Sequence, residues 1–138
     1  MKIRADFVTN SSSSSFVSLS INSPKLVETI EKIRESISSY EKYFKISGNN
    51  FDYYINFDEI GGPNLFSDGF PKNVEEVIRF VFGELLGGVR IEDETVKEIV
   101  ADTKEISMDG SGFDEADSVE GTLSYKNGKL KVKVSHDN

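Results

Sequence analysis

The stretch TLSYKNGKLKVK, residues 122–133, decides the C-terminal part of the fold. Asn127-Gly128 separates two runs in which apolar and polar residues alternate, and this dipeptide is the strongest short-range signal for a type I′ turn. Pairing around the turn gives two apolar pairs, Tyr125 with Leu130 and Leu123 with Val132. The other face then carries Thr122, Ser124, Lys131 and Lys133. The stretch therefore predicts a β-hairpin with one apolar and one polar face.

Three segments upstream also have strand patterns. In residues 16–21, Val17, Leu19 and Ile21 alternate with serines. In residues 51–57, aromatic and apolar residues alternate with polar ones in the same way. A period of two predicts strands with one buried face, and a further strand is expected through 104–108.

A long amphipathic helix is expected between the first two strands. Ser23-Pro24 supplies its start, with serine as the N-cap and proline at the first helical position. Apolar residues then recur at spacings of four and three until Gly48: Leu26, Ile30, Ile33, Ile37, Tyr40 and Phe44. The spacing also fits a coiled-coil seam, but it is too short for a sustained one, which favours packing against the sheet.

A second main helix is expected to begin after Asn73, with Glu76 three residues later as in a capping box. The following apolar residues lie on most sides of this helix, which predicts deep burial, and Gly87-Gly88 predicts its end. A short helix is expected over 93–101.

The loop 61–71 is rich in glycine and proline and carries two aromatic residues, Phe66 and Phe70. We expect these two residues to form a surface that binds a protein partner. The alternative, that both rings pack back onto the core, stays open at this point.

Together these elements predict an α+β fold, with a mostly antiparallel sheet, two main helices packed on one face and the C-terminal β-hairpin. A single domain is expected over 16–138. Residues 1–15 are expected to be a flexible, serine-rich segment that precedes it.

Composition excludes several classes of function. The formal net charge is -8, from 24 acidic and 16 basic residues, and such a chain repels phosphate backbones, so no nucleic-acid partner is expected. The sequence has no cysteine, which excludes disulfides and thiolate chemistry and favours the reducing cytoplasm. No apolar run approaches the roughly 20 residues that cross a membrane, so no membrane association is expected.

The acidic stretch 109–120 has oxygen-bearing residues at four ligand positions of an EF-hand loop: Asp109, Ser111, Asp117 and Glu120. However, Phe113 stands at the fifth position, where an oxygen ligand is needed, and Asp114 stands where a glycine normally makes the sharp turn. An acidic connection between two strands explains the stretch better, and no metal ligand is assigned.

No catalytic constellation occurs in the sequence. There is no glycine-framed nucleophile, phosphate-binding loop or dinucleotide fingerprint, and the single histidine, His136, lies near the C-terminus. We therefore assign no catalytic or cofactor-binding residue, and expect no cofactor and no enzymatic activity.

The N-terminal string Arg4-x-Asp6-Phe-Val-Thr-Asn10 is followed by five serines and Phe16. It resembles the opening segment shared by many uncharacterised bacterial proteins, whose remaining sequences are diverse. The resemblance implies a tag-like segment that a partner or a modifying enzyme reads. On physical grounds a serine tract has no apolar face to bury, so a tether is the ordinary account of it.

These observations favour a small, non-catalytic interaction module with a tag-like N-terminus. The first alternative is a substrate protein whose tract Ser11–Ser15 is modified or cleaved. The second alternative is a calcium-binding protein that uses the acidic stretch 109–120.

Overall fold

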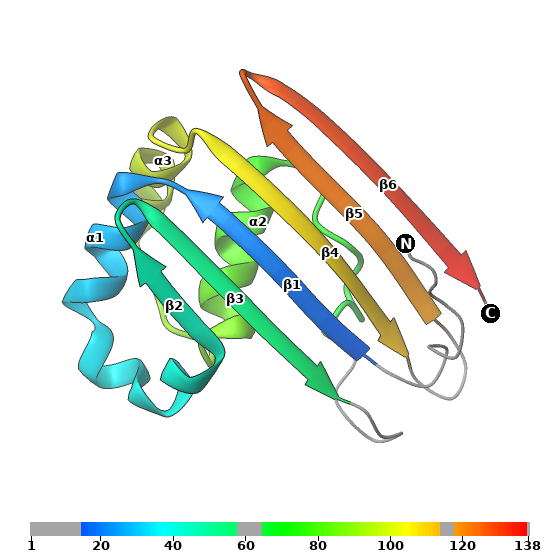
Figure 1. The fold of residues 1–138 in the computed structure, drawn as a ribbon, viewed down its shortest axis with the longest axis horizontal. Coiled ribbons are helices and arrows are strands. Elements are labelled where there is room, and N and C mark those ends of the chain that lie inside the picture. Colours follow the sequence, from blue (N-terminus) through cyan, green and yellow to red (C-terminus); the bar gives the residue numbers. More distant parts are fainter. Residues whose placement is uncertain (1–14, 58–64, 114–117, 138) are drawn as a thin grey trace.

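Six antiparallel strands form one sheet in the order β2-β3-β1-β4-β5-β6 (Figure 1). The computed structural model describes residues 15–57, 65–113 and 118–137. The strands are β1 (Ser15–Asn22), β2 (Phe44–Ser47), β3 (Asn50–Phe57), β4 (Glu105–Phe113), β5 (Ser118–Lys126) and β6 (Lys129–Asp137).

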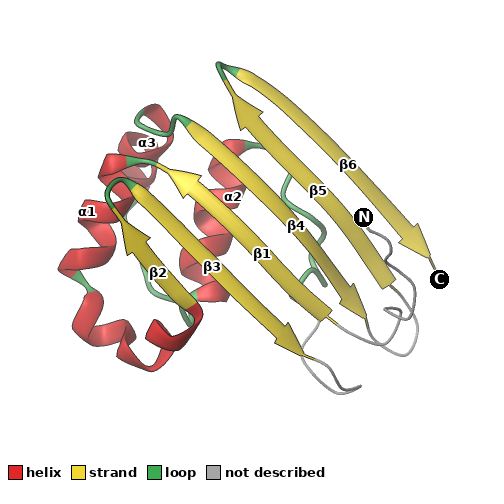
Figure 2. Ribbon diagram, viewed as in Figure 1, coloured by secondary structure: helices red, strands yellow, loops and turns green. Residues whose placement is uncertain are grey.

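The helices lie on one face of this sheet (Figure 2). They are α1 (Pro24–Lys32), the 3₁₀ helix η2 (Arg34–Tyr43), α2 (Val74–Phe80), the π-helix η3 (Val81–Leu85) and α3 (Asp93–Ala101). The predicted α+β domain is therefore confirmed: one antiparallel sheet with a helical layer on a single side.

The core lies between the sheet and the helices. β1 is central, pairs with β3 and β4, and buries Val17, Leu19 and Ile21 on the helical side. Ser18 and Ser20 lie between these residues and therefore point to the opposite side. Alternation in the sequence thus predicts correctly which face of β1 is buried.

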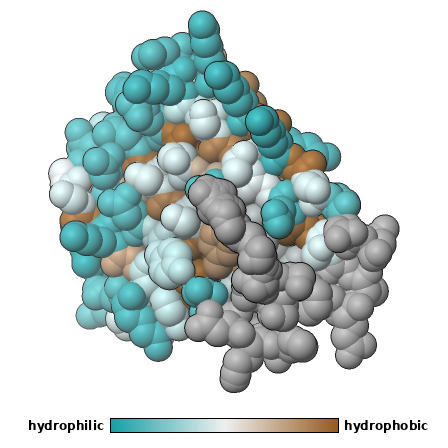
Figure 3. Space-filling model, turned by 45° about the vertical axis from the view of Figure 1, so that its right-hand side comes forward, coloured by the Kyte–Doolittle hydropathy of each residue, from teal (hydrophilic) through white to brown (hydrophobic). Residues whose placement is uncertain are grey.

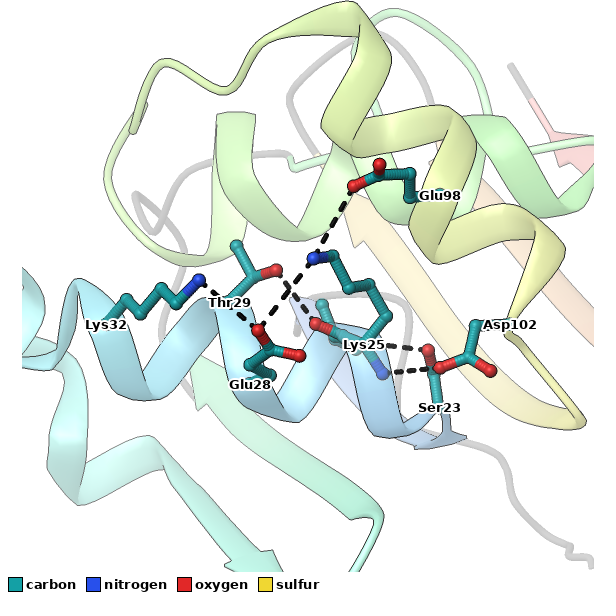
Figure 4. Close-up of polar contacts among 8 residues, drawn as sticks. Ser23, Lys25, Glu28, Thr29, Lys32, Glu98 and Asp102 are labelled. Atoms are coloured by element: carbon teal, nitrogen blue, oxygen red, sulfur yellow. Dashed lines mark hydrogen bonds and ion pairs between the residues drawn. The ribbon is translucent and has the colours of Figure 1, made fainter.

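The α1 N-terminus is held by side chains from two elements (Figure 4). The Leu26 amide donates to Ser23 Oγ at 3.2 Å, so serine is the N-cap that the sequence predicts. The Lys25 amide donates to Asp102 Oδ2 at 2.7 Å, from the residue that follows α3. Lys25 Nζ also lies 3.4 Å from Glu98 on α3. These contacts join α1 to α3.

The prediction of one long helix after Pro24 is wrong. α1 ends at Lys32, η2 follows, and Ile37 has non-helical angles inside it. Residues 44–47 then form β2, which pairs with β3. The apolar spacing is satisfied by successive short elements that each bury one or two of these residues. Serines, which compete with the helix for backbone hydrogen bonds, are frequent in η2.

The second predicted helix is confirmed at its start and changes type before its end. The Glu76 amide donates to Asn73 Oδ1 at 2.8 Å, and Lys72 N donates to Glu76 Oε1 at 2.8 Å. From Val81 the helix widens into η3 and is followed by two glycines with positive φ. The Leu85 carbonyl of η3 accepts a hydrogen bond from the Tyr53 hydroxyl at 2.8 Å. This bond ties η3 to β3.

The C-terminal hairpin forms in the predicted register. Asn127 and Gly128 have φ values of 54 and 76, as a type I′ turn requires. The paired residues of β5 and β6 include Tyr125 with Leu130 and Leu123 with Val132. α3 covers the predicted 93–101, and β4 extends the predicted strand 104–108 to Phe113.

Candidate functional site

Phe66 and Phe70, the pair expected to bind a partner, are buried in the core. Their exposed fractions are 1% and 3%, and their ring centroids lie 5.1 Å apart. Phe66 also stacks on Phe80, with an interplanar angle of 10°. The rings therefore follow the alternative that the sequence left open, and they offer no exposed binding surface.

Two glycines of the sheet explain why these rings fit there. A Cβ atom on Gly110 would lie 2.5 Å from Cζ of Phe66, and one on Gly121 would lie 2.6 Å from Cγ of Phe70. Gly110 and Gly121 are directly paired between β4 and β5. They form a glycine platform on which both rings lie, so the segment 65–71 covers this part of the sheet.

The acidic stretch considered for calcium is mostly strand. Asp109 and Ser111 lie in β4, Glu120 lies in β5, and Ser111 pairs directly with Glu120. The described part of 109–120 therefore forms a ladder of backbone pairs in place of a continuous twelve-residue loop. Asp114 and Asp117 lie outside the described residues. Within the described ranges, no three histidine, cysteine, aspartate or glutamate side chains gather as a metal site requires.

The serine tract lies outside the described residues except for Ser15, which begins β1. Ser15 is 3% exposed and pairs with Phe57 of β3. The last serine of the tract therefore belongs to the sheet.

A further candidate surface is the side of the sheet turned away from the helices, which we call the open face. Its cross-strand rows follow from the register of the strands. One row joins Tyr54, Ser18, Asp109, Thr122 and Lys133, from β3 to β6. The next joins Lys45, Asp52, Ser20, Ser107, Ser124 and Lys131, from β2 to β6. Short hydroxyl-bearing residues thus occupy the middle of the open face.

A hollow of about 360 Å³ lies on this face over β1 and its neighbours. Its lining includes Ser18 and Ser20 of β1, Asp52 and Tyr54 of β3, Ser107 and Asp109 of β4, and Lys42, Tyr43 and Lys45 at the β2 side. The hollow exists because the serines are short while residues on both sides of them are longer. Four strands and the end of η2 therefore contribute to one polar depression.

Asp109 is an acidic residue of the hollow with a shifted pKa. The residue is exposed at the surface, but its neighbours on the sheet partly desolvate the carboxyl group, which raises its pKa. Within the described ranges, no hydrogen bond or ion pair reaches this side chain, and its cross-strand neighbours are Ser18 and Thr122. Asp109 is therefore an exposed acidic residue whose carboxyl group is partly desolvated in the hollow and has no partner among the described residues, as is common at binding sites.

Tyr54 is the exposed aromatic residue at the β3 side of the hollow. Its exposed fraction is 56%, and its hydroxyl accepts a hydrogen bond from Asn56 Nδ2 at 3.2 Å. The ring therefore offers an apolar surface, with its polar end already oriented by a neighbour.

Charge is distributed over the open face in bands that follow the strands. Asp52 on β3 and Asp109 on β4 lie on either side of the central serines, and lysines lie on β2 and β6 at the two edges. Hydrophilic, neutral and hydrophobic residues are mixed over the described surface in Figure 3, which has no single apolar patch in that view. The side chains that line the hollow are mainly polar or charged.

Comparison of the chain with protein-family models, curated proteins and solved structures found no match. No helix in the described part of the chain has the length and apolar character needed to cross a membrane.

The sequence predicts which residues point to the open face, but it does not predict which of them lie together. Ser18, Ser20, Asp52 and Tyr54 have the strand parity opposite to the buried residues, which places them away from the core. Their gathering also depends on the strand order, which puts β1 between β3 and β4. Since that order comes from contacts distant in sequence, parity alone does not predict the hollow.

Proposed function

We propose that this chain is a small, non-catalytic interaction module that binds a protein partner through the hollow of the open face. In this proposal the partner inserts a basic side chain, lysine or arginine, between Asp52 and Asp109. The observation that carries it is the position of Asp109 in the lining of the hollow, as an exposed carboxyl group without a partner among the described residues. We also propose the cytoplasm as its location, a compartment whose reducing conditions suit a sequence without cysteine.

The chemistry of the hollow supports a basic side chain as its occupant. A carboxylate in a partly desolvated position gains more from a cation than a fully hydrated one does. The hydroxyls of Ser18, Ser20 and Ser107 line the same hollow and can accept further N–H groups. Lys42 and Lys45 at the β2 side would repel the cation, so its charged end should point towards β4.

The arrangement of the serines favours binding over catalysis. A nucleophilic serine needs a base within hydrogen-bond reach. Across the described residues, no hydrogen bond connects Ser18, Ser20 or Ser107 to a lysine or carboxylate side chain. His136 lies on β6, opposite Val119. The hollow therefore supplies polar acceptors and charge without an activated nucleophile.

A titration with matched peptides tests this function. The probes are a capped pentapeptide with a central arginine and the same peptide with citrulline, which keeps the shape and removes the charge. In amide nitrogen–proton correlation spectra, the arginine peptide should shift the resonances of Ser18, Ser20, Ser107 and Asp109 most strongly. The citrulline peptide should shift them much less.

Two variants sharpen the test. Asp109→Asn removes the charge at nearly constant shape, and it should weaken binding of the arginine peptide about tenfold or more. Glu84→Gln removes an equivalent charge from an exposed position on η3, and it should leave binding unchanged. Equal shifts with arginine and citrulline, or equal effects of the two variants, would refute the proposed site.

A further inference from the structure

β6 is an edge strand of the sheet, and it is long. It spans nine residues, Lys129–Asp137, and pairs along its whole length with β5 on one side. Within the described ranges, no strand pairs with its other side, and Figure 1 shows it at the outer edge of the sheet. Its outward backbone N–H and C=O groups are therefore available to another strand.

Three helix-side residues of β6, which precede His136 on the same face, are apolar but incompletely covered. The exposed fractions of Leu130 and Val134 are 40% and 42%, while Val132 between them is partly buried. The helices lie behind the β2–β4 side of the sheet in Figure 1, and β6 extends beyond them. An added strand at this edge would cover these side chains.

The first three open-face residues of β6 are basic, and Ser135 and Asp137 follow them on the same face. Lys129, Lys131 and Lys133 alternate with the apolar residues, and no ion pair to them occurs among the described residues. The whole chain has a formal net charge of -8, so this strand is a local exception. The edge of β6 therefore has unpaired backbone groups, basic side chains on the open face and apolar side chains on the helix side.

We propose that β6 receives an extended segment of a partner protein as a seventh strand, in which acidic and apolar residues alternate. The acidic side chains would lie beside Lys129, Lys131 and Lys133, and the apolar ones beside Leu130 and Val134. Backbone hydrogen bonds supply sequence-independent affinity in this mode, and the alternating side chains supply selectivity. The proposal rests on the charge and exposure of β6 and is independent of the hollow.

Charge decides between an acidic partner and a second copy of this chain. In the full-length antiparallel register of two β6 strands, Lys133 would lie directly opposite Lys133 of the second copy, and in the register centred on Lys131 the two lysine rows would face each other. Like charges on directly opposed strands destabilise a sheet, and lysines at an edge commonly prevent self-association for this reason. An acidic strand at the same edge would instead be attracted by these lysines.

Peptide binding to the full chain tests this inference. The probe is a capped nonapeptide that alternates glutamate and valine, and its controls replace glutamate with glutamine or with lysine. Binding is followed by fluorescence anisotropy, and its location by hydrogen exchange of the β6 amides. The glutamate peptide should bind most tightly, should lose affinity as salt rises from about 50 to about 500 mM, and should protect the outward amides of β6.

Matched charge reversals locate the interaction. Lys131→Glu combined with Lys133→Glu should weaken binding of the glutamate peptide about tenfold or more. Lys97→Glu, on the exposed side of α3, changes charge away from the edge and should have an effect below about twofold. Asp109→Asn should leave this binding intact, so failure here is distinguishable from failure of the proposed hollow.

Three results would overturn the proposal. The first is equal binding of the glutamate and glutamine peptides, since charge would then not select the partner. The second is protection of β2 amides in place of β6 amides. The third is a concentration-dependent dimer that protects β6 by itself, which sedimentation and hydrogen exchange together would reveal and which would assign the edge to a second copy.

Discussion

Replacing Gly121 with alanine should destabilise the protein, although alanine is normally better than glycine within a strand. The new Cβ atom would lie 2.6 Å from Cγ and Cδ1 of Phe70 and 2.8 Å from Cδ2. Carbon atoms in favourable contact are about 3.5–4.0 Å apart, so the ring must retreat by about 1 Å. Phe70 is 3% exposed and lies against Phe66, which itself rests on Gly110, so the retreat disturbs a packed row of rings.

The size of the effect follows from two opposing contributions. Alanine loses less conformational entropy on folding than glycine does, which stabilises a strand by about 0.5–1 kcal/mol. Overpacking of a well-filled core costs about 1–3 kcal/mol. The two contributions leave a loss of about 0–2.5 kcal/mol in the free energy of unfolding, and because the contact is short and the ring is itself packed against Phe66, we expect about 1–2 kcal/mol for Gly121→Ala. For a chain of this length, that loss corresponds to a fall of about 4–8 °C in Tm.

Urea unfolding followed by circular dichroism measures this loss. Gly83→Ala is the control, because nothing lies within 4 Å of a Cβ atom at Gly83, and it should stabilise the protein slightly. In a Phe70→Ala background the obstructing ring is gone, so Gly121→Ala should become neutral or stabilising. The packing account is refuted if Gly121→Ala is neutral in the wild-type background, or if its cost is unchanged when the ring of Phe70 is absent.

Three further substitutions test other contacts. Tyr53→Phe should cost about 1–2 kcal/mol, because it leaves the buried Leu85 carbonyl without its donor. Burial raises the pKa of Tyr53, so in an absorbance titration this residue should be the last tyrosine to ionise. Above pH about 10 the unfolded chain loses this proton while the folded chain keeps it, so the stability of the wild-type protein should fall. The raised pKa of Asp109 means that folding disfavours its carboxylate, so the wild-type protein should lose stability relative to Asp109→Asn as pH rises from about 3 to 7. Urea unfolding measures this difference, and a variant less stable than wild type at pH 7 would contradict it. Asp102→Ala should cost about 1 kcal/mol in the same assay by freeing the Lys25 amide, and an unchanged midpoint would contradict the capping role.

Local sequence signals predict the elements that depend on neighbours in the chain. The Asn127-Gly128 turn fixes the register of β5 and β6, and Asn73 fixes the start of α2, because both act within a few residues. The interrupted helix after Pro24 shows the limit of such signals. Its apolar spacing fits a helix and also fits the sequence α1, η2 and β2, and the choice depends on pairing with β3.

The buried aromatic pair shows a second limit. Phe66 and Phe70 look available in a loop rich in glycine and proline, and nothing near them in sequence indicates burial. Their places are made by Gly110 and Gly121, about forty to fifty residues later in the chain, whose missing side chains leave room for the rings. A glycine inside a predicted strand is therefore a sign that another group approaches the sheet there, but it does not say which group.

The two proposed surfaces are close but electrostatically separable. Asp109 on β4 and Lys133 on β6 occupy one cross-strand row, with Thr122 between them. Two strand spacings place their backbone positions roughly 10 Å apart. Both residues are exposed, so the value for charges in water applies: at this distance they interact by about 0.4 kcal/mol, and reversal of one charge changes the interaction by about 0.8 kcal/mol. Screening over a Debye length of about 8 Å reduces this change to about 0.2 kcal/mol, or less than about twofold in affinity. Lys133→Glu should therefore hardly change binding of the arginine peptide, so each surface can be accepted or rejected without reference to the other.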